Sequence, residues 1–228
     1  MTAVYVEEGP DKGAIWHFGQ PAQEQRMLAE GKAWADLSHL SIITVTGDDR
    51  IKWLHDLTTQ HLLNIASGDW LPAMILDHNG HVEYQFNLVD DGTTTFIVID
   101  PSYAEALLAY LLKMRFMLKV DAADSSSEYA VLRAPGQPNE IGGPYALVPR
   151  GELDEMKKVF SENAKEVGTW SLDAERVAAG RPRHGVDTDH KTIPNEIGVL
   201  NKDVHMNKGC YRDRKSTRLN SSHLGISR

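Results

Sequence analysis

The chain has 228 residues, of which 41% are hydrophobic and 25% are charged, and its formal net charge is −8. This composition is typical of a globular protein with a buried core, and the acidic balance excludes bulk binding to nucleic acids or anionic membranes. No apolar run could span a bilayer and the N-terminus lacks a signal-peptide pattern, so we expect a cytoplasmic protein. The single cysteine excludes an internal disulfide framework.

The first half of the chain predicts an antiparallel β-meander between two helices. A β-branched strand at residues 42–46 is followed by a helix that Asp48 caps. Three further strand patterns are joined by Asn-Gly and Asp-Gly turns, which are strong hairpin signals. These strands are predicted at residues 71–76, 82–88 and 94–99.

The second predicted helix begins at Pro101, with Asp100 as its cap. Its apolar residues recur at helical spacing and therefore predict one buried stripe. The stripe consists of Ala104, Leu107, Leu108, Leu111 and Leu112.

The following part of the chain alternates irregularly between strands and helices. The polar residues 121–128 predict a surface crossover, while residues 129–133 and 145–149 predict strands. Helices are predicted at residues 151–167 and from the N-cap Ser171 to Gly180. This irregular order indicates an α+β fold rather than a parallel doubly wound sheet.

The polar side chains that suggest chemistry are concentrated between residues 176 and 211, in a stretch predicted to be mostly loop. One interpretation is a solvated loop, and another is a binding site. His184, Asp187 and His190 could also form a metal ligand set, but their spacing matches no strong zinc pattern, and we expect no metal site. The charged and imidazole side chains of this stretch include Arg181, Arg183, His184, Asp187, Asp189, His190 and Glu196.

Cys210 allows two interpretations. A lone cysteine is often a small buried hydrophobic residue. Here Gly209 gives close backbone access, and the cations Lys208 and Arg212 would favour the thiolate, which is the reactive form. One cysteine cannot hold an iron–sulfur cluster by itself, because such clusters usually need four thiolate ligands.

Lys208, Gly209, Cys210 and Tyr211 resemble the start of the K-G-C-Y-x-G-Q-E signature of YgfZ-type folate-binding proteins, which act in iron–sulfur cluster assembly or repair. The resemblance covers residues 14–212. The wider family includes the aminomethyltransferase, or T-protein, of the glycine cleavage system, which uses tetrahydrofolate. Four further motifs carry the resemblance, namely RVAAGRPRHGVDTDHKTIPNE at 176–196, DLSH at 36–39, VTGDDR at 45–50 and LHDLTTQ at 54–60.

The resemblance implies a T-protein-like α+β fold with antiparallel sheets, flanking helices and two interleaved subdomains. We expect one subdomain at about 1–48 with 118–212 and the other at 49–117. Residues 213–228 look like a translated sequencing adapter, and the further C-terminal β-rich domain of the family would then be missing.

The resemblance also implies a folate site. Glu196 matches a carboxylate associated with the pterin head, and Asp187 and Asp189 match nearby positions. We add one inference that the resemblance does not supply: Arg183 or Arg181 could meet the glutamate tail of the folate, which an acidic protein would otherwise repel. The implied ligand is tetrahydrofolate or a one-carbon derivative, and the implied partners are iron–sulfur enzymes or their assembly proteins.

One departure from the aminomethyltransferases bears on activity. Tyr84 and Gln85 occupy the region where those enzymes carry a catalytic aspartate, and neither can act as a carboxylate base, so we expect no aminomethyl transfer. The favoured function is a folate-binding accessory factor for iron–sulfur enzymes, with Cys210 as a functional thiol. The alternative is a folate-dependent one-carbon transferase in which Cys210 is structural.

Overall fold

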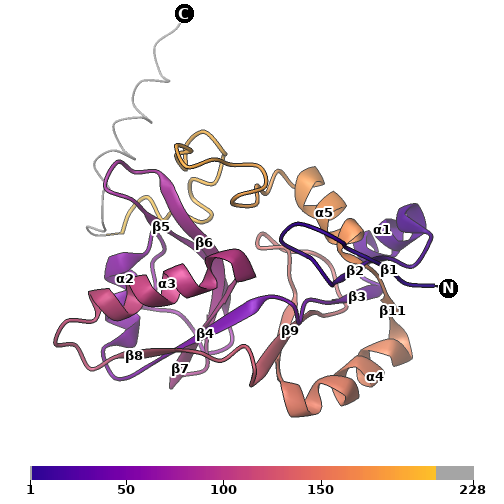
Figure 1. The fold of residues 1–228 in the computed structure, drawn as a ribbon, viewed down its shortest axis with the longest axis horizontal. Coiled ribbons are helices and arrows are strands. Elements are labelled where there is room, and N and C mark those ends of the chain that lie inside the picture. Colours follow the sequence, from indigo (N-terminus) through magenta and orange to yellow (C-terminus); the bar gives the residue numbers. More distant parts are fainter. Residues whose placement is uncertain (1, 209–228) are drawn as a thin grey trace, which may run out of the picture. The chain divides into compact units, whose positions relative to one another are not determined.

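The computed structural model describes residues 2–208, which form two compact units with interleaved chain segments (Figure 1). The first unit contains residues 2–44, 98–108 and 123–180, and the second contains residues 45–97, 109–122 and 181–208. The division differs from the expected subdomains mainly because residues 181–208 belong to the second unit. Gly209, Cys210, Tyr211 and the predicted tail at 213–228 lie outside the described residues.

The first unit contains a four-stranded sheet in the order β10-β9-β3-β11. Strand β9 pairs antiparallel with both β10 and β3, while β11 pairs parallel with β3. The strands predicted at 129–133 and 145–149 are confirmed as β9 and β10, whereas β3 and β11 were not predicted. The bounds are β3 Ala33–Asp36, β9 Tyr129–Arg133, β10 Tyr145–Pro149 and β11 Lys165–Glu166.

Helices cover both faces of this sheet. Side chains alternate between the two faces of a strand, and in β3 the residues Ala33 and Ala35 pack with Leu28 of α1, whereas Trp34 packs with Phe160 of α4. Figure 1 shows α1 and α5 on one side of β3 and α4 on the other. Strand β3 is therefore apolar without the alternation that would identify it in the sequence. The helices are α1 Pro21–Ala29, α4 Leu153–Asn163 after the 3₁₀ turn Arg150–Glu152, and α5 Thr169–Ala178.

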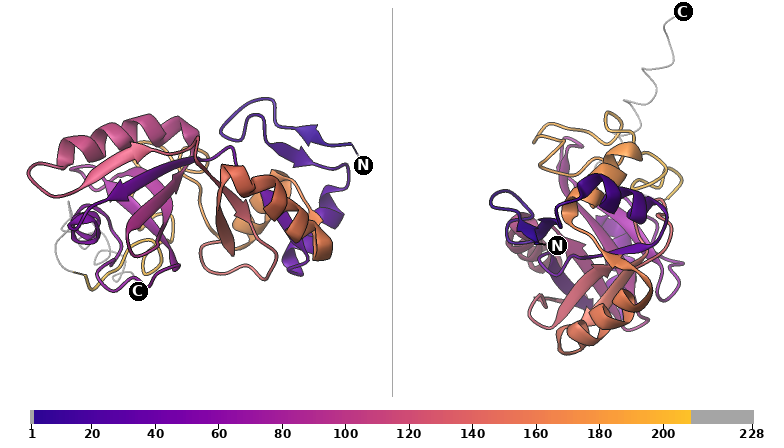
Figure 2. Two further views of the ribbon diagram at one scale, coloured as in Figure 1. Left: turned by 90° about the horizontal axis from the view of Figure 1, so that it is seen from below. Right: turned by 90° about the vertical axis from the view of Figure 1, so that its right-hand side faces the viewer.

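A buried carboxylate joins a small hairpin to the rest of the first unit. The hairpin consists of β1 (Val4–Tyr5) and β2 (Ile15–His17), and β2 contacts α5 (Figure 2). Glu24 is 3% exposed and accepts hydrogen bonds from the backbone N–H groups of Phe18 (2.8 Å) and Gly168 (3.1 Å). Its charge is stabilised by these donors, because a buried carboxylate needs hydrogen bonds in place of water.

A five-stranded sheet in the order β5-β6-β7-β4-β8 contains the predicted meander. The four strands predicted in the first half of the chain are confirmed, and β5 and β6 form an antiparallel hairpin. The predicted surface crossover at 121–128 is wrong in part, since it contains β8, an edge strand in which only Ala122 is buried. The bounds are β4 Ser41–Thr46, β5 Trp70–Leu76, β6 Val82–Asp90, β7 Thr94–Ile99 and β8 Asp121–Asp124.

Three details of the predicted helices are corrected. Asp49 rather than Asp48 precedes α2 (Arg50–Leu57), and its carboxylate accepts the N–H of Lys119 at 2.9 Å instead of capping the helix. In α3 (Pro101–Met114) Leu107 and Leu111 are fully buried, but Leu112 is 43% exposed. Helix α5 begins at Thr169, so the predicted N-cap Ser171 is a buried residue of its first turn.

Among residues 2–208, no helix is both long and apolar enough to cross a membrane.

Gly47, in the VTGDDR motif, allows a close contact between two loops of the second unit. Its φ angle is +105°, and a Cβ atom at this position would lie 2.0 Å from the carbonyl oxygen of Lys119. Gly92 has a similar φ of +98°, but a Cβ there would meet nothing within 4 Å. Of these two glycines, only Gly47 is therefore required by both the backbone conformation and the space around it.

We predict that Gly47→Ala destabilises the protein more than Gly92→Ala does. Both substitutions incur the cost of a left-handed backbone, about 1–2 kcal/mol, and the contact with Lys119 should add about 1–3 kcal/mol at Gly47. Urea denaturation of the two variants measures the difference. Equal losses of stability would show that the Lys119 loop moves away at little cost.

Candidate functional site

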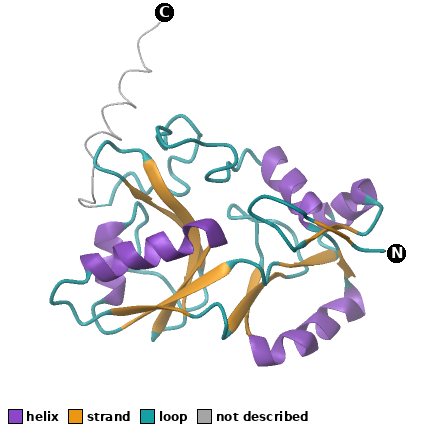
Figure 3. Ribbon diagram, in the orientation of Figure 1, coloured by secondary structure: helices purple, strands orange, loops and turns teal. Residues whose placement is uncertain are grey.

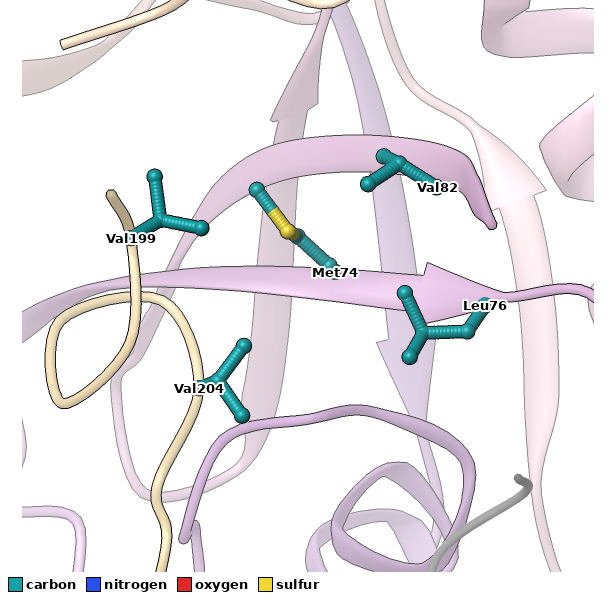
Figure 4. Packing of buried hydrophobic residues seen from close by; sticks show 5 residues of the cluster. All are labelled: Met74, Leu76, Val82, Val199 and Val204. Atoms are coloured by element: carbon teal, nitrogen blue, oxygen red, sulfur yellow. The ribbon is translucent and has the colours of Figure 1, made fainter. Parts of the chain in front are cut away.

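Residues 181–208 follow α5 and form turns with one isolated bridge, between Leu200 and Val204 (Figure 3). Apolar side chains attach this segment to the second unit. Val199 and Val204 pack on Met74 and Leu76 of β5 and on Val82 of β6 (Figure 4). The predicted site residues therefore lie on a loop whose base is part of the hydrophobic core.

The LHDLTTQ motif forms the hydrogen bonds that hold the end of this loop. The Thr59 hydroxyl donates to the carbonyl of Asp203 (2.6 Å), and the Thr59 carbonyl accepts the N–H of His205 (3.0 Å). The Gln60 side-chain amide donates to the carbonyls of Lys202 (2.9 Å) and Pro72 (3.0 Å). The motif thus replaces the backbone partners that an irregular segment lacks.

Lys208, the first residue of the K-G-C-Y motif, binds in turn to residues of the LHDLTTQ motif. Its side chain is 1% exposed, and its ammonium donates to the carbonyls of Thr58 (2.6 Å), Gln60 (2.8 Å) and His55. These carbonyls lie at the C-terminal end of α2, where unpaired carbonyls and the helix dipole favour a cation. Lys208 therefore has a structural role that joins two motifs far apart in the sequence.

Three imidazole rings lie in contact near this cation, the first pair edge to face and the second pair tilted. The ring of His61 lies 4.9 Å from that of His55 and 5.1 Å from that of His205, measured between centroids. His55 is buried, and its Nδ1 accepts the N–H of Leu62 at 3.2 Å. Burial lowers the pKa of His55, and the nearby charges of Lys208 and His61 lower it further.

Three of the four predicted folate-binding residues lie around one depression of about 500 Å³ in the loop. Asp187, Asp189 and Glu196 line it, and all three are exposed. Arg183 is not among the lining residues, and its backbone N–H donates to the Asp187 carboxylate at 2.8 Å. The remaining lining residues are Val186, Thr188, Lys191 and Thr192.

Each of these carboxylates also stabilises a turn of its own loop. Asp189 accepts the N–H of Lys191 (2.8 Å) and the hydroxyl of Thr192 (3.0 Å), and both bonds lower the pKa of its carboxyl group. Glu196 accepts the N–H of Ile193 at 3.3 Å. The solvated-loop interpretation therefore explains these contacts, while the exposed faces of the carboxylates leave room for a ligand.

Asp203 and Gln85 were not predicted as site residues. The Asp203 carboxylate is 8% exposed and accepts the side-chain N–H of Gln85 at 3.0 Å. Burial raises the pKa of Asp203, and the hydrogen bond from Gln85 opposes that shift. The region of Tyr84 and Gln85 thus does have a carboxylate beside it, supplied by a loop that follows more than 100 positions later. No sequence signal marks Asp203, because this contact exists only in the folded chain.

Within the part of the chain that the structure describes, no three His, Cys, Asp or Glu side chains are grouped to hold a metal ion. His184, Asp187 and His190 do not form the ligand set that their spacing allowed. The ring of His184 instead contacts the hydroxyl of Thr188, at 3.1 Å from Nδ1. Cys210 lies outside the described residues.

We predict that Lys208→Met lowers the free energy of unfolding by roughly 2–4 kcal/mol, because three buried carbonyls lose their donor. Lys202→Met is the matched control, since Lys202 is exposed, and it should change stability by less than about 0.5 kcal/mol. Urea denaturation compares them. A small loss at Lys208 would mean that water replaces the ammonium.

We also predict that stability decreases as pH falls below about 6.5, the ordinary pKa of histidine. The pKa of His55 is lower in the folded chain, so the unfolded chain takes up the proton first and is favoured. His55→Asn keeps an acceptor for Leu62 and cannot titrate. Its free energy of unfolding should therefore change less than that of the wild type between about pH 7.5 and pH 5.5.

His78→Asn is the control for this experiment, because His78 is exposed. An identical pH dependence in the wild type and in His55→Asn would show that His55 is not the responsible group.

No family model matches the chain. Its sequence is 20% identical, over 256 aligned residues and 95% of this chain, to an Arabidopsis thaliana protein provisionally named a chloroplastic transferase. The chain spans 59% of the length of that relative. Its structure is similar to the glycine cleavage system aminomethyltransferase T from Bartonella henselae, with a TM-score of 0.75 and 16% identity over 99% of this chain and 72% of that one. The expected α+β fold of T-protein type is confirmed, while neither similarity singles out the YgfZ-type proteins.

Proposed function

We propose that the chain is the folate-binding part of an accessory protein for the assembly or repair of iron–sulfur enzymes. The observation that carries the folate proposal is the cluster of Asp187, Asp189 and Glu196 around one depression, on a fold similar to that of an aminomethyltransferase. The proposed ligand is tetrahydrofolate or a one-carbon derivative of it. We place this function in the cytoplasm.

The chemistry of the pterin ring fits a carboxylate partner. The ring presents an amino group and an adjacent N–H on one edge, and the two oxygens of Glu196 can accept parallel hydrogen bonds from them. Hydrogen bonds from Lys191 and Thr192 lower the pKa of Asp189, which favours the carboxylate form, and this form can serve as a further acceptor. Arg183 is proposed to meet the negatively charged glutamate tail, because its guanidinium can bind a carboxylate with two parallel bonds.

The alternative function is a folate-dependent one-carbon transferase. Two observations favour it, namely the similarity to an aminomethyltransferase and the presence of the Asp203 carboxylate next to Gln85. A transferase needs a general base or an orienting carboxylate near the one-carbon unit. Asp203 weakens the argument that this region lacks any carboxylate, so the expected absence of aminomethyl transfer stays a prediction for assay.

We predict that Glu196→Ala weakens tetrahydrofolate binding about tenfold or more, because a charge-assisted hydrogen-bond pair is worth roughly 1.5–3 kcal/mol. Isothermal titration calorimetry under anaerobic conditions measures the affinity. Glu162→Ala is the control, since Glu162 is exposed on α4 in the first unit. Unchanged affinity in Glu196→Ala would remove Glu196 from the site.

We predict that Cys210→Ser impairs the maturation of iron–sulfur enzymes and leaves tetrahydrofolate binding unchanged. Serine has nearly the size of cysteine but cannot supply a thiolate. The measurement is the activity of an iron–sulfur dehydratase in cells in which the variant replaces the natural protein. Full dehydratase activity with Cys210→Ser would favour the transferase alternative, in which Cys210 is structural.

A further inference from the structure

We infer that Asp203 and Gln85 are positioning residues of the proposed folate site. They hold the loop that lines the depression, residues 186–196, in place through the backbone of His184. The inference rests on the proposed function for the identity of the ligand. Neither residue is required to touch that ligand. The inference adds to the site two residues that lie outside the acidic cluster.

The first step is the orientation of the Gln85 amide. Its nitrogen donates to the Asp203 carboxylate, and its oxygen accepts the backbone N–H of His184, each at 3.0 Å. A carboxylate can only accept and a backbone N–H can only donate, so a flipped amide would lose both bonds. Gln85 is thereby held in one orientation by partners on two sides.

The hydrogen bonds from Asp203 through the Gln85 amide to the N–H of His184 form a relay. Its base, Gln85 and Asp203, is held rigidly. Gln85 lies in β6 and is paired with Met74 of β5. The backbone of Asp203 is fixed by the hydroxyl of Thr59 (2.6 Å) and by the carbonyl of Val199, which accepts its N–H at 3.1 Å. Both side chains therefore project from parts of the second unit that belong to its core.

His184 connects this relay to the depression lined by Asp187 and Asp189. His184 is fixed at its N–H by Gln85, and its ring contacts the hydroxyl of Thr188. The same hydroxyl accepts the N–H of Gly185 at 3.0 Å, and Thr188 lines the depression between Asp187 and Asp189 in the chain. Loss of the Gln85 contact should therefore release the part of the loop that carries two of the proposed folate ligands.

The last step concerns the charge of Asp203. Burial of a carboxylate is unfavourable, and a neutral side chain could fill the same space. An ionised acceptor makes a stronger hydrogen bond than a neutral one, and it polarises the amide that it holds. Burial raises the pKa of Asp203, and the hydrogen bond from Gln85 and the charges of Lys202 and Arg181 oppose this shift and favour the ionised form. A strong anchor for Gln85 is a physical reason for a carboxylate at this position.

The test exchanges the two ends of the Asp203–Gln85 bond. Gln85→Glu keeps an oxygen for His184 but removes the donor and places two carboxylates face to face. Combining it with Asp203→Asn restores the bond in the opposite direction. The introduced side-chain amide can donate to one oxygen of the new carboxylate, while the other oxygen still accepts from His184. Gln23→Glu, on the exposed face of α1, controls for the added charge.

Two measurements are made on the 228-residue chain, tetrahydrofolate affinity by calorimetry and backbone hydrogen exchange in residues 184–192. We expect Gln85→Glu to weaken binding and speed exchange by about tenfold or more, and the double variant to return within about threefold of the wild type. Urea denaturation of each variant shows whether only the loop is released or the whole fold is destabilised.

Failure of the relay and failure of the proposed function give different results. Wild-type affinity and exchange in Gln85→Glu, or a double variant as impaired as the single one, would overturn the relay. A wild-type chain that binds no tetrahydrofolate would overturn the folate proposal and the ligand part of the inference, while hydrogen exchange still decides whether the relay holds the loop.

Discussion

The irregular segment 181–208 must satisfy its backbone polar groups without a helix or sheet of its own, and the arrangement of the second unit depends on how this is achieved. Buried N–H and C=O groups without partners are costly, so side chains from elsewhere supply the partners. Thr59 and Gln60 hold the end of the segment, and the ammonium of Lys208 satisfies carbonyls at the end of α2. The loop and the helix end thus stabilise each other.

This reciprocity changes the interpretation of the motifs. LHDLTTQ and the lysine of the K-G-C-Y motif look like candidates for chemistry, since they are polar and lie close to predicted loops. In the structure Lys208 and Thr59 face the protein, each 1% exposed, whereas Asp56 of the LHDLTTQ motif is exposed and pairs with Lys52. The exposed carboxylates of Asp187, Asp189 and Glu196 are different, because they combine local turn contacts with access to solvent.

The protein places several ionisable groups in its interior, and three of them show how such groups find partners. Glu24 accepts backbone N–H groups, Asp90 pairs with Arg50 at 2.9 Å, and Asp203 pairs with Gln85. Buried charges contribute little net stability, because desolvation offsets the attraction. Their directional bonds are more informative about specificity, since a wrong loop position would leave a charge unpaired. The proposed relay is one instance of this effect.

Much of the fold could be predicted from local sequence. The strands of the meander were identified correctly because alternation and Asn-Gly or Asp-Gly turns act over a few residues. Strand β3 escaped prediction because helices cover both its faces, and β8 because an edge strand can be polar. In both cases the burial of the strand is decided by elements distant in the sequence.

The same division holds for the site. The sequence by itself determined the α+β class and the polar loop, since these depend on residue type and short-range order, while the candidates Asp187, Asp189 and Glu196 were implied by the resemblance to folate-binding proteins. Only the tertiary structure decided that Lys208 is buried and binds carbonyls at the end of α2, and that Asp203 lies beside Gln85. Contacts between residues more than 100 positions apart leave no periodic pattern, because chain folding rather than local geometry brings the partners together.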